Sequence, residues 1–157
     1  MTGLPSTQII STSLVLAGEQ RARLDAHAAG TDEATLTVLW GALMLTITAA
    51  HQARHLHTTW SAAAQQATRL PQGAVPGNRH IDHRLTGTST SVRLWGTPAV
   101  SITHHHTRVT PGRRVITGHV AVGYGSLTFQ VLDLTAYAST LGIVARTAAL
   151  AAAVFGP

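Results

Sequence analysis

Hydrophobic residues in the first 30 positions recur at three- and four-residue steps, a spacing typical of an amphipathic helix. Ser6 or Thr7 can cap such a helix, and it would run to about Ala29. Gly30 follows as a C-terminal stop, because glycine accepts the left-handed conformation that often ends a helix. The pattern therefore predicts a first helix over residues 7–29. Its apolar face would carry Ile10, Leu14, Ala17 and Leu24.

A second and longer helix is predicted from Asp32, its capping residue, to Arg69, with Pro71 ending it. An α-helix over 33–69 would be about 55 Å long. Because this length exceeds what a small domain needs, we expect a break near Gly41 or near residues 57–59. The apolar positions that support this helix are Leu36, Leu39, Leu43 and Ile47.

The second half of the chain changes to alternating apolar and polar residues rich in β-branched side chains. Glycine and proline separate four such runs, and Thr110-Pro111-Gly112-Arg113 forms a turn in which we expect Gly112 to take a positive φ. Asp133 can cap a last, Ala-rich helix from Leu134 to about Phe155. The four predicted strands are Ser91–Trp95, Ala99–Val109, Arg114–Gly123 and Ser126–Leu132.

The order of these elements predicts an α+β fold: two N-terminal helices, a four-stranded antiparallel sheet and a C-terminal Ala-rich helix. With 157 residues, the chain is expected to form a single domain over 1–157. The helical part would cover 1–70, a connecting loop 71–90, and the sheet with the last helix 91–157. We identify no internal repeat in the sequence.

Charge is scarce and unevenly distributed. Charged residues make up 11% of the chain, against about 25% in an average protein, so the surface has weak self-repulsion. This favours self-association into a homo-oligomer or a structural subunit of a larger, phage-like particle. The formal charge of +5 lies within 78–116, where six arginines face Asp82; elsewhere arginines and acids balance. The six are Arg79, Arg84, Arg93, Arg108, Arg113 and Arg114.

A concentrated arginine cluster indicates an anionic partner, because guanidinium groups fit phosphate oxygens in pairs. An antiparallel two-stranded ribbon can also enter the major groove of DNA. The primary hypothesis is therefore a small, non-enzymatic protein that binds nucleic acid or another polyanion through the hairpin and the loop before it. Six phosphate contacts would give a salt slope of about −5 on duplex DNA.

Histidines offer a second hypothesis, a metal site. If Val109 pairs with Arg114, His104 lies opposite His119, and His106 shares the face of His104. A register shift of one residue would place His105 opposite His119 instead. Three imidazoles at that spacing could hold zinc or another divalent metal. The chain contains no cysteine, which excludes disulfides and thiolate ligands.

Two histidines on a strand, followed by a tyrosine on a later helix, resemble the HUH single-strand nucleases. That resemblance implies metal ligation by His104 and His106 and a nucleophilic role for Tyr137. His105 departs from the family's pattern, which has an apolar residue between the two histidines, and the chain lacks lysine. Because no G-x-S-x-G, P-loop or paired carboxylates are present either, we expect no enzymatic activity.

The run 34–50 is free of charge and 17 residues long. About 20 apolar residues span a bilayer, and four threonines dilute this run, so we expect it to be buried in protein rather than in a membrane. The first 20 residues lack a basic segment ahead of an apolar run, which argues against a secretory signal and predicts a cytoplasmic location.

Overall fold

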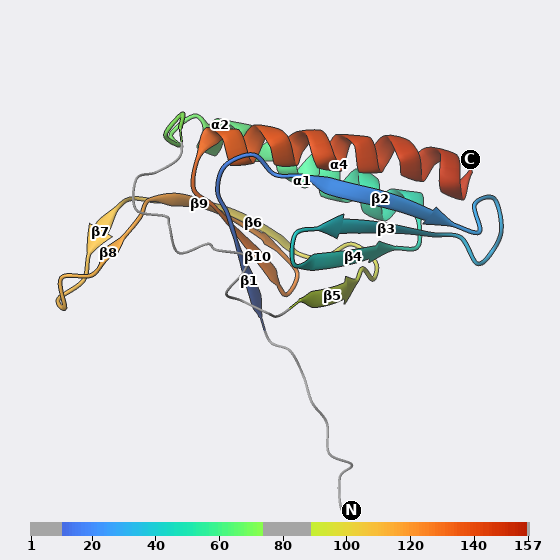
Figure 1. Ribbon diagram of the computed structural model, residues 1–157, viewed down its shortest axis with the longest axis horizontal. Helices are drawn as coiled ribbons and strands as arrows, with labels where there is room; N and C mark the ends of the chain where they lie inside the picture. The colour runs from blue at the N-terminus through green and yellow to red at the C-terminus, as the bar shows by residue number, and fades with distance from the viewer. Residues whose placement is uncertain (1–10, 74–88, 157) are drawn as a thin grey trace, which may run out of the picture.

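The computed structural model describes residues 11–73 and 89–156 (Figure 1). Two four-stranded mixed sheets and two principal helices make up an α+β fold, as the sequence predicted in class. The first sheet has the order β1 (Thr12–Leu16), β10 (Leu127–Val131), β9 (His119–Tyr124) and β6 (Val100–His105). The second has the order β2 (Ala22–His27), β3 (Thr35–Trp40), β4 (Leu43–Ile47) and β5 (Thr90–Arg93).

The remaining elements are a short ribbon and the helices. The ribbon consists of β7 (Arg108–Val109) and β8 (Val115–Ile116), which pair only with each other. The helices are α1 (Ala50–Ala62), the single turn α2 (Ala64–Ala67) and α4 (Leu134–Phe155). α1 and α4 lie side by side next to the sheets (Figure 1).

The two halves of the chain repeat one element order: a first strand, three antiparallel strands, and a helix. The first half gives β1, β2, β3, β4 and α1, and the second gives β5, β6, β9, β10 and α4. In each case the first strand runs parallel to the last strand of the other half. Equivalent hydrogen bonds join them, from Thr12 N to Ser126 O and from Thr90 N to Ala42 O, both 2.8 Å long. The structure therefore corrects the expectation that the chain has no repeat.

The repeat is also visible in the tight turns between the paired strands. Trp40 and Gly41 end β3 and begin its turn, and Tyr124 and Gly125 do the same after β9. Gly41 has φ +56° and Gly125 has φ +60°, which only glycine adopts at little cost.

The core lies where both sheets meet α1. The buried Trp60 ring from α1 is 6.3 Å from the Trp40 ring in the second sheet and 5.5 Å from the Phe129 ring in the first. Trp40 and Phe129 are themselves stacked at 5.4 Å. Aromatic pairs at these distances stabilise beyond the area that they bury. One side chain of α1 therefore joins both sheets.

The predicted helix over residues 7–29 is wrong in the part that the structure describes. Residues 12–16 and 22–27 are strands β1 and β2, while its start at Ser6 or Thr7 lies outside the described residues. Inward and outward side chains alternate along β1 and over the first four residues of β2, as with half-buried Leu24 between exposed Arg23 and Asp25. The apolar residues in and beside these two short strands happen to be spaced three, four and seven positions apart in the sequence, which is also the spacing of a helix face.

The predicted long helix is wrong up to residue 49. Beyond it the chain is helical as far as Ala67, but the break lies at Ala63, between α1 and α2, and not at residues 57–59. Residues 35–47 form the β3–β4 hairpin, and helix starts only at Ala50. The break expected at Gly41 is the hairpin turn. Buried residues here alternate, which is the strand period, and the β-branched threonines between them suit strands as well. The alternating buried set is Leu36, Val38, Trp40, Leu43, Leu45 and Ile47. The run 34–50 is therefore not a membrane helix.

The last helix is confirmed, including its cap. Asp133 Oδ1 accepts a hydrogen bond of 2.7 Å from Ala136 N, and Oδ2 accepts one of 2.8 Å from Gly18 N. By length and composition α4 could cross a membrane, but its inward face, with Tyr137, Ile143 and Val144, is buried in the core. The cap thus also fastens the connection after β1 to the start of α4.

Candidate functional site

The ribbon of β7 and β8, residues 108–116, projects from the first sheet between β6 and β9 (Figure 1). We call it the arm. Thr110 N donates to Arg114 O at 2.9 Å, and Arg113 N donates to Thr110 O at 2.8 Å, which closes the turn. Arg113, and not Gly112 as predicted, takes the positive φ, at +60°. A type I turn followed by a left-handed residue is a common hairpin connection, but glycine usually fills that last position.

The arm is basic and exposed. Arg108, Arg113 and Arg114 are all exposed, and the ion pairs within the described part of the chain are Arg21–Glu19 and Arg23–Asp25. No described acid therefore neutralises the arm's guanidinium groups. Between them lies an apolar pair: Val109 and Val115 oppose each other in the ribbon, with exposed fractions of 65% and 60%.

Four of the six predicted arginines lie in the part of the chain that the structure describes, and these four do not share one edge. Arg93 lies on β5, in the second sheet, whereas the arm leaves the first. Its guanidinium carbon lies 5.2 Å from the ring centroid of Trp95, which is 76% exposed. Arg79 and Arg84 lie outside the described residues. The described members of the predicted arginine cluster thus lie in two separate places, the arm and the Arg93–Trp95 pair.

The predicted histidine triad is divided between the two faces of the first sheet. His105, not His104, pairs with His119, so the register is the one shifted by a single residue, and their rings stack at 4.8 Å. His104 and His106 lie on the other face with ring centroids 4.7 Å apart. Over residues 11–73 and 89–156, no group of three metal-ligating side chains is close enough to hold a metal ion. The predicted zinc site formed by His104, His106 and His119 is corrected accordingly.

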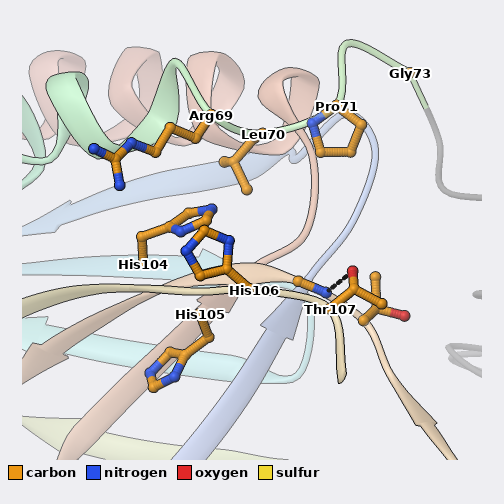
Figure 2. Close-up of a pocket in the computed structure, with 10 residues that line it drawn as sticks. Arg69, Leu70, Pro71, Gly73, His104, His105, His106 and Thr107 are labelled. Atoms are coloured by element: carbon orange, nitrogen blue, oxygen red, sulfur yellow. Dashed lines mark hydrogen bonds between the residues drawn. The ribbon is translucent and has the colours of Figure 1, made fainter. Parts of the chain in front are cut away.

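A pocket of about 430 Å³ lies between the segment that follows α2 and the root of the arm (Figure 2). On the helical side are Arg69, Leu70 and Pro71. The rings of His104 and His106 lie beside each other on the sheet side, while His105 points away from them (Figure 2). The pocket also includes Gly73, Thr107, Thr117 and Gly118. Since His106 and Thr107 precede β7 and Thr117 and Gly118 follow β8, the pocket and the arm adjoin.

His104 is the least solvated histidine of this pocket. Its Nδ1 atom is buried and has no hydrogen-bond partner in the part of the chain that the structure describes. Burial lowers the pKa of the His104 imidazole from 6.5, and the nearby His106 and Arg69 lower it further. The ring is therefore neutral at pH 7 while its surroundings are basic.

The other residues singled out from sequence have structural roles. The Tyr137 hydroxyl donates to Trp60 O at 2.7 Å, and burial raises the pKa of this phenol, which does not suit a nucleophile. The burial of Tyr137 in the core thus argues against the nucleophilic role that the HUH resemblance implies for it. His55 Nδ1 lies 2.9 Å from the hydroxyl of Tyr124, whose pKa burial raises to about 12.

Two residues of interest were not predicted from sequence, Arg69 and Trp95. Arg69 was interpreted as one of the arginines balanced by an acid, yet it lines the pocket. Trp95 was predicted to be the last residue of a strand, but β5 ends at Arg93 and the Trp95 side chain is exposed. No protein-family model matches the chain, and neither a curated protein nor a solved structure shows significant similarity to it.

Proposed function

We propose that this chain is a non-enzymatic binding protein that engages a polyanion, most directly nucleic acid, through the arm. One observation carries the proposal: a projecting ribbon with three exposed arginines and, within the described residues, no acidic partner. Unpaired guanidinium forks fit phosphate oxygens, and an antiparallel ribbon has the width to enter a major groove.

The repeat supports this assignment of the site. In the first half, β2 and β3 are joined by residues 28–34, whereas the equivalent strands β6 and β9 are separated by the whole arm. The first half thus forms the same strand arrangement with a short connection in place of the arm, which makes the arm an addition to the repeated unit. Binding residues concentrate on such projections from rigid elements.

The backbone conformation of Arg113 is a further argument. A left-handed conformation costs an L-residue about 1–2 kcal/mol, which glycine avoids. An arginine at this position makes the turn less stable than glycine would, but it places a guanidinium group at the tip of the arm. Strain of this kind accompanies function more often than it accompanies packing.

The test compares two double variants in fluorescence anisotropy with a labelled mixed-sequence DNA duplex. Arg113→Ala with Arg114→Ala should weaken binding by about tenfold per arginine. Arg54→Ala with Arg146→Ala is the matched control, because it removes the same charge from exposed positions on α1 and α4. Equal losses in the two double variants would contradict the proposal, and so would no binding by the wild type at low salt.

A second candidate function, self-association, rests on a different observation. Val109 and Val115 place an exposed apolar patch on the arm, and a small domain rarely leaves such side chains on a projection without a contact. In this alternative the arm packs against a second copy of the chain in an assembly. Sedimentation velocity of Val109→Thr with Val115→Thr tests it, because threonine keeps the strand shape. A wild type that stays monomeric at high concentration contradicts it.

A further inference from the structure

The pocket at the root of the arm is electrostatically one-sided. The ionisable groups that act on His104 are His106, Arg69, His105 and His119, and all of them are basic. Arg69 extends along the helical side of the pocket and the two imidazoles line the sheet side (Figure 2). A concave site with a guanidinium on one wall and imidazoles that become cationic on protonation on the other raises the local concentration of anions.

The pocket also leaves a polar atom without a partner. A buried ring nitrogen that lacks a hydrogen bond costs about 1–3 kcal/mol, and native proteins seldom tolerate this cost without a reason. His104 Nδ1 is in this state among the described residues. The atom is shielded from solvent even while the pocket is empty, so a ligand in the pocket satisfies it only when the His104 ring rotates toward the cavity.

The donors match a phosphate group. Arg69 offers five N–H donors in a planar fork, and each protonated imidazole offers two. A carboxylate has only two oxygens to accept them, whereas a phosphate monoester presents three charged or strongly accepting oxygens to three separate side chains. The volume of about 430 Å³ also exceeds that of the anion alone and leaves room for the group esterified to it.

We propose that this pocket is a phosphate-monoester site, in which Arg69, His104 and His106 hold the terminal phosphate of a ligand. The site is distinct from the arm's contact with a polymer backbone and does not depend on it. The same phosphate chemistry occurs in free nucleoside monophosphates and at the phosphorylated end of a nucleic acid strand.

Binding should take up a proton. At neutral pH His104 is uncharged, and a phosphate dianion beside it stabilises the imidazolium form. The other ionisable groups that act on His104 are Arg69 and His106 in the pocket and His105 and His119 on the opposite face, and none of them supplies a negative charge that would offset this effect. A phosphate monoester itself takes up a proton at about pH 6, so the affinity is compared for the dianion; for this form it should rise as the pH falls from 7.5 to 6.5.

The experiment is isothermal titration of the full chain with inorganic phosphate and with adenosine monophosphate at pH 7. Arg69→Gln should lower the affinity at least about tenfold, the expected effect of a lost charge-assisted contact. His104→Gln should weaken binding and abolish the proton uptake, which is measured from the enthalpy in buffers of different ionisation heat. Because Arg69 is exposed, its variant should keep the native circular dichroism spectrum.

Two controls match these variants. His51→Gln removes an exposed imidazole from α1, and Arg146→Gln removes an exposed guanidinium from α4. Both should bind adenosine monophosphate within about twofold of the wild type. Wild-type protein that binds neither ligand at about 1 mM, or controls that lose as much affinity as Arg69→Gln, would overturn the proposal.

A comparison of DNA strands identifies the source of the phosphate. A short strand with a 5′-phosphate that binds more tightly than the same strand with a 5′-hydroxyl assigns the pocket to strand ends. Equal affinity of the two strands, with monophosphate still bound, assigns it to free ligands. Arg113→Ala with Arg114→Ala should leave monophosphate binding unchanged. The proposal for the pocket can therefore be contradicted without contradicting the proposal for the arm.

Discussion

Arg113 shows at the residue scale how the arm trades stability for charge. Its left-handed backbone is strained by about 1–2 kcal/mol relative to glycine. Arg113→Gly should therefore tighten the turn and slow hydrogen exchange of the Thr110 amide, which bonds to Arg114 O, by up to about tenfold. The same variant should bind DNA more weakly. Faster exchange at Thr110 would contradict this account of the turn.

His104 should make the fold sensitive to acid. Its pKa in the folded protein lies below 6.5, chiefly because of burial, whereas the unfolded chain takes up the proton near 6.5. The contribution of neutral His104 to the free energy of unfolding is therefore complete above about pH 6.5, and it is lost as the pH falls through the pKa of the folded protein. We expect His104→Gln to lose less free energy of unfolding than the wild type between pH 7.5 and 5.5, measured with urea. The same pH dependence in both proteins would contradict the prediction.

At this scale the sequence predicted the right residue types but not their placement. The arginines of the hairpin and the histidines 104–106 were identified, yet their grouping depended on register. A shift of one residue moves every side chain of a strand to the other face, so the predicted His104–His119 pair became His105–His119. The sequence could not fix that register, because the turn closes on a left-handed arginine, which propensities do not anticipate.

At the scale of elements, the two hairpin turns provide a matched comparison. Gly41→Ala and Gly125→Ala each force alanine into positive φ, at a cost of about 1 kcal/mol. A Cβ at Gly41 meets open space, but one at Gly125 lies 3.1 Å from Pro98 Cβ. Gly125→Ala should thus have the lower free energy of unfolding in urea. A larger loss for Gly41→Ala would show that the turns are not packed as described.

The strands and the last helix of the second half were predictable, but the predicted single antiparallel sheet was wrong, because β5 pairs in parallel with β4 in the second sheet. The strands of the first half were not predicted. Strands 126–132 and the helix from 134 are bounded by a glycine turn and an aspartate cap, which act locally. Residues 36–47 instead satisfy both periods: Leu36, Leu39 and Leu43 fit a helix, while the buried side chains alternate. These residues form strands because β3 pairs with β2 and β4 pairs with β5. Both partners are short edge strands, and β5 is also distant in sequence, so the local pattern does not reveal the pairing.

At the scale of the whole molecule, each half completes the other. β1 pairs with β10 and β5 pairs with β4, so neither half contains its own fourth strand. Fragments produced by cleaving the chain between residues 73 and 89 should be unstructured separately and should recover the native circular dichroism spectrum when mixed in equal amounts. A fragment that folds cooperatively by itself would contradict this interdependence.

The repeat escaped sequence analysis for a physical reason. What the halves share is confined to buried alternating positions and one glycine turn, which many sequences satisfy. The arm also lengthens the connection between β6 and β9, so the two halves differ in the spacing of their strands along the sequence. Once the fold is known, the same interruption becomes informative, because it marks the segment that the scaffold does not require.

The most direct test of the central claim is the salt dependence of DNA binding. On duplex DNA the logarithm of the binding constant falls with the logarithm of salt concentration by about 0.9 per phosphate contact. Replacing Arg108, Arg113 and Arg114 together by alanine should therefore make the slope shallower by about 2.7, while the Arg54→Ala, Arg146→Ala control keeps the wild-type slope. A slope unchanged by loss of the three arm arginines would contradict the claim that the arm binds the polyanion.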